Sequence, residues 1–179
     1  ESMSEPANFD IIVIGAGPAG QKAAIQGAKA GKRVALIERE RGIGGSGVYR
    51  GTIPSKTLRE SALHLDRLKR ASAAFDFSLK PDTQIATLLS RLESVVSAHD
   101  TFMSRQLRRN GIFLFHGRAH FIDARTVEMQ TVDGACQRFT AGAIVLATGS
   151  RPRTPDNIPV DHEHILDSDS LLSMIYLPH

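Results

Sequence analysis

The sequence predicts an α/β domain built on a parallel β-sheet. Three short and almost wholly apolar runs, 9–14, 33–37 and 143–147, have the composition of strands buried on both faces of such a sheet. A glycine-rich turn and an Ala-rich helical stretch, 21–30, separate the first run from the second. The first strand, the helix and the second strand together make a βαβ unit of about thirty residues.

Two long helices are predicted between the second and third apolar runs. The first extends from Ile53 to about Ala73 and has Pro54 in its first turn, where the missing N–H costs nothing. The second covers roughly 83–110, where apolar residues recur at helical spacing, and Gly111 ends it. The apolar stripe of this second helix predicts packing against the sheet.

A β-hairpin or meander is predicted beside the parallel strands. Residues 112–115 and 119–122 have the composition of short strands. The segments 126–132 and 135–140 alternate apolar and polar residues on either side of Asp133-Gly134, a pair that favours a tight hairpin turn. The sequence therefore predicts a mixed sheet in which this insertion adds antiparallel strands.

The composition narrows the possible function classes. The chain has 179 residues, a formal net charge of +3 and Lys and Arg spread over the predicted helices and loops, so we expect no nucleic-acid binding. No apolar run approaches the ~20 residues of a membrane span. The single cysteine, Cys136, cannot form an intramolecular disulfide, which favours a reducing, cytoplasmic compartment. The seven histidines show no metal-ligand spacing, so no metal site is predicted.

A dinucleotide-binding fingerprint lies between the first predicted strand and helix. Gly15, Gly17 and Gly20 form a G-x-G-x-x-G pattern, and Glu38 ends the second strand about twenty residues later. Gly15 allows the tight turn, Gly17 lets the backbone approach a pyrophosphate, and Gly20 lets the helix and strand pack closely. Glu38 is suited to accept hydrogen bonds from an adenosine ribose and to repel a 2′-phosphate. The pattern predicts a Rossmann-like domain but does not decide between FAD and NAD.

The segment GIGGSGVYRGTIPSK, residues 42–56, resembles the redox-active segment of the pyridine nucleotide–disulfide oxidoreductase superfamily. The family pattern GG-T-C-x-x-x-G-C-x-P-S-K is matched at Gly44, Gly45, Gly51, Pro54, Ser55 and Lys56. Its two cysteine positions are occupied by Gly47 and Thr52. The stretch AIVLATGSRP, residues 143–152, is similar to the second fingerprint of two-dinucleotide-binding-domain flavoproteins, where the strand end passes near the flavin nucleotide. The resemblance implies FAD as the cofactor.

Within this superfamily, GTIPSKTLRE (51–60) and DSDSLLSM (167–174) are most similar to the soluble, Si-specific NAD(P) transhydrogenases. This resemblance implies FAD-dependent hydride exchange between NADPH and NAD, the two nicotinamide nucleotides being the substrates. Thr52 has no accessible redox state, so electrons leave the flavin only to a second nucleotide. Two alternatives stay open: a non-catalytic dinucleotide-binding module, and another flavin-dependent NAD(P)H oxidoreductase of the dihydrolipoamide dehydrogenase-like group.

The resemblance also implies roles for individual residues. Lys56 is the predicted catalytic residue, in the environment of the flavin N5 atom. The predicted cofactor-binding residues are Gly15, Gly17, Pro18, Ala19, Gly20, Glu38, Arg39, Gly44, Gly45, Thr52, Lys56, Ala147, Thr148 and Gly149.

The domain organisation is predicted in three segments. We expect residues 1–8 to be a tag remnant or disordered terminus, and 9–152 to be the N-terminal segment of an FAD-binding domain. Residues 153–179 are expected to be a linker, with a short helix at 168–174, leading to an absent NAD(P)-binding domain. We expect this fragment alone to be inactive and weak at best in holding FAD, and the full-length protein to be a homo-oligomer.

Overall fold

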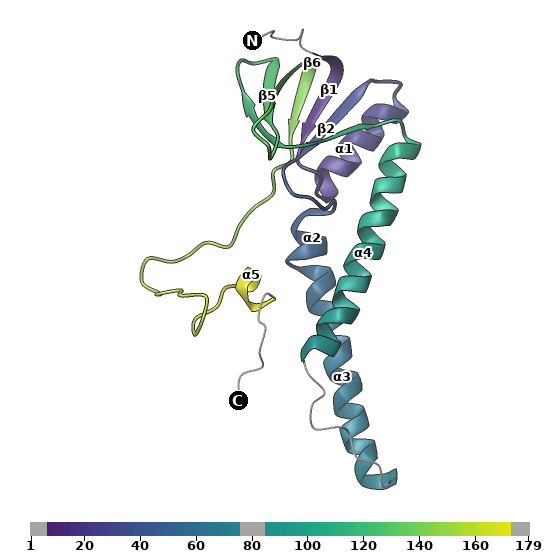
Figure 1. Ribbon diagram of the computed structural model, residues 1–179, viewed down its shortest axis with the longest axis vertical. Helices are drawn as coiled ribbons and strands as arrows, with labels where there is room; N and C mark the ends of the chain where they lie inside the picture. Colours follow the sequence, from purple (N-terminus) through teal and green to yellow (C-terminus); the bar gives the residue numbers. More distant parts are fainter. Residues whose placement is uncertain (1–6, 76–84, 173–179) are drawn as a thin grey trace. The chain divides into compact units, whose positions relative to one another are not determined.

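The computed structural model, which describes residues 7–75 and 85–172, contains a six-stranded sheet with α1 (Pro18–Lys29) beside it (Figure 1). The strands are β1 (Ala7–Ile14), β2 (Val34–Glu38), β3 (Phe113–His116), β4 (Arg118–Phe121), β5 (Thr126–Gln130) and β6 (Cys136–Leu146). They lie in the order β3-β2-β1-β6-β5-β4. The first four in this order pair in parallel, and β6, β5 and β4 pair antiparallel. The predicted α/β fold with a parallel sheet and an added meander is confirmed.

The observed helices agree with the predicted ones except for one short helix, α2. The structure has α1 (Pro18–Lys29), α2 (Gly45–Tyr49), α3 (Thr52–Phe75), α4 (Ile85–Arg109) and α5 (Ser168–Leu171). Gly31 and Gly111 follow α1 and α4 with φ angles of 74° and 68°, the left-handed conformation that ends a helix. The expected start of α4 near Thr83 lies outside the described residues. Helix α2 was not predicted, because its sequence GSGVY has two glycines and no helical periodicity.

The chain divides into two compact units. The first combines 1–45 with 100–150 and contains the sheet, α1 and the C-terminal end of α4. The second combines 46–99 with 151–179 and contains α3, the larger part of α4, and α5. Each unit is described by itself below.

The sheet of the first unit is packed on both faces. On one face, Val13 and Leu36 pack in a cluster with Ala24 of α1 and Leu107 of α4. On the other face, residues of β1 and β2 pack against the β5–β6 hairpin, and Phe139 is fully buried among them. Adjacent residues of β1 belong to opposite clusters, as the alternation of side chains along a strand requires. The meander therefore packs against the face of the parallel strands β1 and β2 that lies opposite α1.

Strand β6 corrects two predictions. The sequence indicated separate strands at 135–140 and 143–147, whereas β6 is continuous from Cys136 to Leu146. It is continuous because it pairs with β1 along most of its length, whereas its pairing with β5 ends at Thr140. The expectation that its last part is buried on both faces is also wrong: Leu146 is 64% exposed, since β6 has no β5 beside it there.

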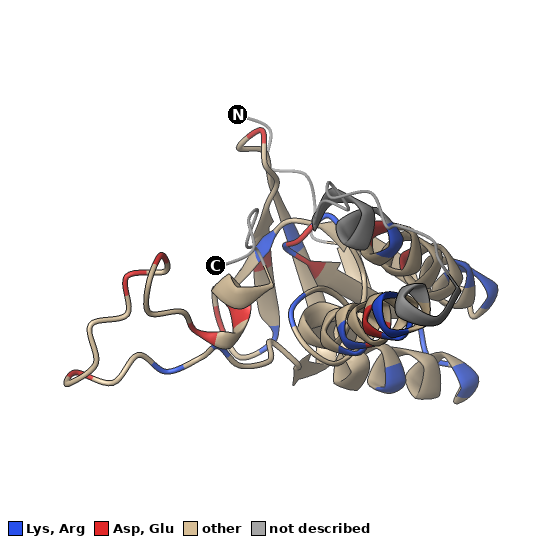
Figure 2. Cartoon of the chain, turned by 90° about the horizontal axis from the view of Figure 1, so that it is seen from below, with Lys and Arg blue, Asp and Glu red and all other residues tan. Residues whose placement is uncertain are grey.

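The helices carry mixed charge. Figure 2 shows basic residues distributed along the helices, with acidic and uncharged residues between them. Among the residues that the structure describes, no helix is both long and apolar enough to cross a membrane.

Phe139 provides a test of the meander core. Its ring lies 4.7 Å from that of Phe115, centroid to centroid, and none of its surface is exposed. We predict that Phe139→Ala lowers the free energy of unfolding by about 3–5 kcal/mol, because it removes a buried ring and leaves a cavity. Val132, which is 92% exposed, is the control, and Val132→Ala should change stability by less than about 0.5 kcal/mol. Denaturant unfolding followed by circular dichroism measures both; equal effects would contradict the described core.

Candidate functional site

The turn between β1 and α1 needs two of its glycines for the fold itself. Gly15 has a φ of 103°, and a Cβ atom there would collide with the carbonyl oxygen of Ala147. A Cβ at Gly20 would collide with the carbonyl oxygen of Gly15. The backbone also joins strand end to strand end, since the N–H of Ala147 donates to the Ile14 carbonyl at 2.8 Å. Gly15 and Gly20 thus permit the turn and the close approach of helix and strand.

Gly17 is different, because no described residue lies close enough to require glycine there. Its φ of −71° and ψ of −179° are extended backbone that any residue adopts. An added Cβ would meet only the Cα of Gly45, at 3.9 Å, which is an ordinary van der Waals contact. The structure therefore leaves room directly against the backbone at Gly17. Such room is what a pyrophosphate needs in order to approach the turn.

The start of α1 is electrostatically suited to an anion. Gly17 is the N-cap residue and offers no side chain to the first N–H groups of the helix. Pro18 occupies the first helical turn, which contains no acidic residue. The N-terminal N–H groups and the helix dipole together stabilise negative charge at such an end. Residues 17–20 thus fit the phosphate groups of a dinucleotide.

Glu38 lies beside this turn and makes backbone contacts that the sequence did not predict. Its side chain is buried, with 7% exposed, at the end of β2. Oε2 accepts a hydrogen bond from the N–H of Ala16 at 2.6 Å, and Oε1 accepts one from the N–H of Glu40 at 3.0 Å. Each carboxylate oxygen has a second lone pair, so each can accept one further hydrogen bond. Glu38 therefore both supports the turn and fits the predicted ribose contact.

The glycine pair after β2 reaches the same turn. The N–H of Gly44 donates to the carbonyl of Ala16 at 3.0 Å. Gly45 has a φ of 60°, and a Cβ there would lie 2.9 Å from the Cα of Gly17. The structure thus brings together three separately predicted pieces: the turn 15–20, the pair 44–45 and the end of β6 at Ala147. Thr148 and Gly149 follow that strand end and are exposed.

The sequence analysis missed two residues, one that contacts this turn and one that contacts the loop before Gly44. Gln21 is 7% exposed, and its Nε2 donates to the carbonyl of Ala16 at 2.8 Å. Asp100 of α4 accepts a hydrogen bond from the N–H of Ile43 at 2.6 Å, through Oδ1. A long amide side chain in the Ala-rich first turns of α1 was a signal for Gln21. No sequence signal pointed to Asp100, which lies 57 positions from its partner.

The remaining predicted residues lie elsewhere. Arg39 is exposed and pairs with Glu40, with 3.4 Å between Nε and Oε1. Thr52 and Lys56 belong to the second unit, where both are exposed on the first two turns of α3. Their predicted contact with a flavin stays a prediction. Among the described residues, no group of three or more His, Cys, Asp or Glu side chains could hold a metal ion.

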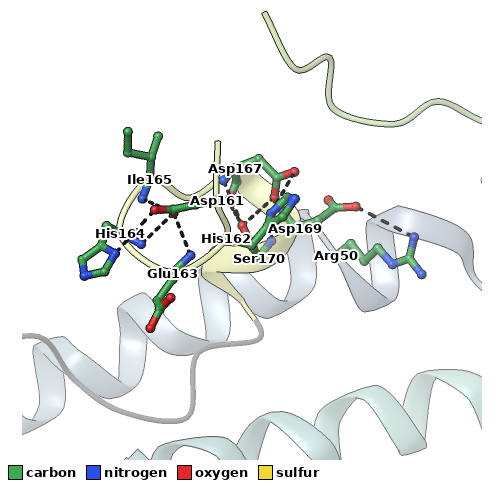
Figure 3. A network of polar contacts seen from close by, with 9 residues as sticks. All are labelled: Arg50, Asp161, His162, Glu163, His164, Ile165, Asp167, Asp169 and Ser170. Carbon is green, nitrogen blue, oxygen red and sulfur yellow. Dashed lines mark hydrogen bonds and ion pairs between the residues drawn. The ribbon is translucent and has the colours of Figure 1, made fainter. Parts of the chain in front are cut away.

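A network of aspartates organises the second unit before α5 (Figure 3). Oδ1 of Asp161 accepts hydrogen bonds from the backbone N–H groups of Glu163, His164 and Ile165, at 2.8–2.9 Å. These bonds, that from Ile165 foremost, hold the pKa of Asp161 well below its usual value. His162 closes the loop with a φ of 60°, which is uncommon for a residue other than glycine.

The same segment ends in a capped helix. Asp167 caps α5 through a capping box with Ser170, which explains the DSDS stretch in structural terms. Asp169 on α5 forms an ion pair with Arg50, the residue after α2, with 3.8 Å between Oδ2 and Nη1 (Figure 3). The short helix predicted at 168–174 is confirmed for 168–171, and 173–174 lie outside the described residues.

Comparison with known proteins identifies the family. The sequence profile described as pyridine nucleotide-disulphide oxidoreductase matches residues 9–174. The chain belongs to this family. The glycines around Gly17 (Gly15, Gly17, Gly44 and Gly45), called the cradle below, leave room for the phosphates of a dinucleotide, in agreement with this membership.

The relatives include proteins named soluble pyridine nucleotide transhydrogenase. That of Mycobacterium tuberculosis is 42% identical over 175 residues, which cover 95% of this chain and 37% of the relative. That of Erwinia tasmaniensis is 39% identical over 176 residues, covering 98% of this chain and 38% of the relative. The chain thus spans less than two fifths of the length of these relatives.

Solved structures show the same fold. LpdA from Mycobacterium tuberculosis is similar with a TM-score of 0.78 and 29% identity, over 94% of this chain and 38% of that one. The HOCl-induced flavoprotein disulfide reductase RclA from Escherichia coli, as its Cu(II) complex, has a TM-score of 0.76 and 27% identity, over 96% and 35%.

The contrast among the glycines gives a direct test of the cradle. We predict that Gly17→Ala in the full-length protein leaves the cofactor-free stability within about 0.5 kcal/mol of wild type. The added methyl group occupies the space required by a pyrophosphate, so FAD affinity should fall by at least about tenfold. Gly20→Ala is the contrasting variant, and it should destabilise the cofactor-free protein, because its Cβ meets the Gly15 carbonyl. Thermal unfolding and FAD titration measure the two effects; unchanged FAD affinity in Gly17→Ala would refute the cradle.

The hydrogen bonds that Asp161 accepts should be lost only at a pH well below the usual pKa of an aspartate. A carboxyl whose pKa is lowered on folding stabilises the fold above its unfolded value, near 3.9, and loses that contribution as the pH falls through the folded pKa. We expect the amides of Glu163, His164 and Ile165 to keep their protection from exchange at pH 4 and to lose it only well below that. In Asp161→Asn, protection should not depend on pH in this range. A wild-type midpoint near 3.9 would show that the three bonds do not form.

Proposed function

We propose that the chain is the N-terminal part of the FAD-binding domain of a soluble pyridine nucleotide transhydrogenase, an enzyme that exchanges hydride between NADPH and NAD. The proposal is supported by relatives of that name at about 40% identity over nearly the whole chain. The chain spans 37–38% of those relatives, and in the proposal the nicotinamide nucleotides bind in the remaining length.

The residues of the first unit hold the cofactor in this proposal. The N–H groups at the start of α1 receive the pyrophosphate beside Gly17, and the Gly44-Gly45 loop lies against the same turn. Glu38 orients the adenosine ribose and disfavours a 2′-phosphate. When bound, FAD supplies the two-electron redox centre that the side chains of the chain lack.

The observation that carries the choice of reaction is the absence of sulfur from an otherwise matching segment. Gly47 and Thr52 stand where the family pattern has its cysteines, and neither side chain can form a mixed disulfide. Cys136, the single cysteine, lies on β6 in the first unit, so it does not belong to that segment. This argues against a disulfide as the electron acceptor, and in the proposal the electrons leave to a second nicotinamide nucleotide. Lys56 is proposed to stabilise the electron-rich flavin through its positive charge.

A second candidate is favoured by the solved structures. LpdA and RclA belong to the same fold, and RclA is named a disulfide reductase. A flavin-dependent NAD(P)H oxidoreductase with another electron acceptor would use the same cradle and the same lysine. It differs from a transhydrogenase only in the molecule that reoxidises the cofactor.

The proposal also covers the cell compartment and the binding partners of the full-length protein. An exposed free thiol such as Cys136 is typical of a reducing compartment, so we propose a cytoplasmic location. The partners proposed for the full-length protein are nicotinamide nucleotides and further copies of itself.

The decisive measurement is hydride exchange by the full-length protein. We predict NADPH-dependent reduction of an NAD analogue with ping-pong kinetics, because the first nucleotide must leave before the second reacts. Alkylation of all thiols should leave the rate unchanged, and dihydrolipoamide and oxidised glutathione should not be turned over. Cys136→Ser, tested without alkylation, is the control for damage at the one thiol of this chain. Alkylation-sensitive disulfide reduction would exclude the transhydrogenase, and rapid reduction of a quinone without nucleotide exchange would favour the second candidate.

A further inference from the structure

We propose that Gln21 and Asp100 are positioning residues that hold the phosphate-binding turn in its ligand-receiving form. The inference rests on the proposed FAD function of the turn and extends it to two side chains outside the glycine fingerprint. Neither residue is placed against the cofactor itself. Each acts through the backbone of the cradle.

The backbone of Ala16 is the point on which these contacts converge. Ala16 is fully buried between Gly15 and Gly17. Its N–H donates to Glu38, and its carbonyl accepts from Gln21 at 2.8 Å and from the N–H of Gly44 at 3.0 Å. Both polar groups of this residue are thus held, by side chains from β2 and α1 and by the backbone of the glycine loop.

Helix α4 supports the same cradle from one further side. Asp100 accepts the N–H of Ile43, the residue that precedes the Gly44-Gly45 pair. Met103, one helical turn later, lies with its Sδ 3.4 Å from the Nε2 of Gln21. The two α4 positions therefore contact the glycine loop and the side chain that holds Ala16. All of these residues belong to the first unit.

The physical need for such support follows from the glycines. A turn with glycines at 15 and 17, and a facing loop with glycines at 44 and 45, has many backbone conformations available. A ligand that must first order these segments loses affinity by the cost of ordering them. Hydrogen bonds that fix Ala16 and Ile43 before binding remove that cost. Gln21 and Asp100 thus contribute to affinity by organising the site in advance.

Glu38 also holds Ala16, but a Glu38 variant would lose both the support of the turn and the predicted contact with the ribose. Variants of Gln21 and Asp100 lose only the support of the turn and of its facing loop. Gln26 lies on α1 like Gln21 but is exposed, and Thr101 is the exposed neighbour of Asp100. These two positions are matched controls for removing a polar side chain from the same helix.

The experiment uses the full-length protein with FAD as the probe. We expect Gln21→Leu and Asp100→Leu to weaken FAD binding by about ten- to a hundredfold, while Gln26→Leu and Thr101→Leu stay within about twofold of wild type. Asp100→Asn keeps an oxygen that accepts the N–H of Ile43, so it should restore most of the affinity. In the cofactor-free protein, hydrogen exchange at the amide of Ile43 should accelerate in Asp100→Leu, and exchange at the amides of 15–17 in Gln21→Leu.

The outcomes separate this inference from the proposed function. If the wild-type protein does not bind FAD, the proposed function fails, and exchange in the cofactor-free variants still decides whether the two side chains order the turn. Unchanged exchange in both leucine variants would overturn the positioning role. So would FAD binding equal to wild type in both, or an Asp100→Asn variant as impaired as Asp100→Leu, which would indicate a general loss of packing.

Discussion

The hydrogen bond between Glu38 and the N–H of Ala16 is the constraint on which the rest of the site depends. A carboxylate with 7% of its surface exposed is costly unless donors satisfy it. Two backbone N–H groups do so, one from the turn and one from Glu40. The end of β2 and the turn after β1 must therefore form together, because neither satisfies its polar groups alone. The parallel pairing of β1 and β2 is what brings them side by side.

The sheet makes this arrangement rigid by packing on both faces. Helix α1 and the C-terminal end of α4 cover one face of the parallel strands, and the meander covers the other. Strand β6 takes part in both layers, since it continues from its antiparallel pairing with β5 into the strand end that meets Gly15. The position of Ala147, the third segment of the candidate site, is thus set by the same strand that closes the meander. A single element links the core to the edge of the site.

The fold was predictable wherever one local pattern decides the structure. The glycine turn, the first two apolar runs and the Asp133-Gly134 hairpin each carry their own signal, and the structure agrees with them. The short helix α2 was not predictable, because its sequence GSGVY has two glycines and therefore low helix propensity. The continuity of β6 was missed for a related reason: pairing partners, not composition, determine where a strand stops. The contact of Asp100 with Ile43 was not predictable, since a polar residue on a long amphipathic helix is normally exposed to solvent.

The unequal demands on the three glycines have an evolutionary consequence. Positions 15 and 20 are constrained by folding, so every chain that keeps this turn is expected to keep them whether or not a nucleotide binds. No described residue restricts position 17 to glycine, so the proposed ligand is what would constrain it. In a descendant that retained the scaffold but abandoned its ligand, selection on that residue would relax first. The side chain found at this one position in homologous chains therefore serves as a marker that separates working nucleotide sites from inherited architecture.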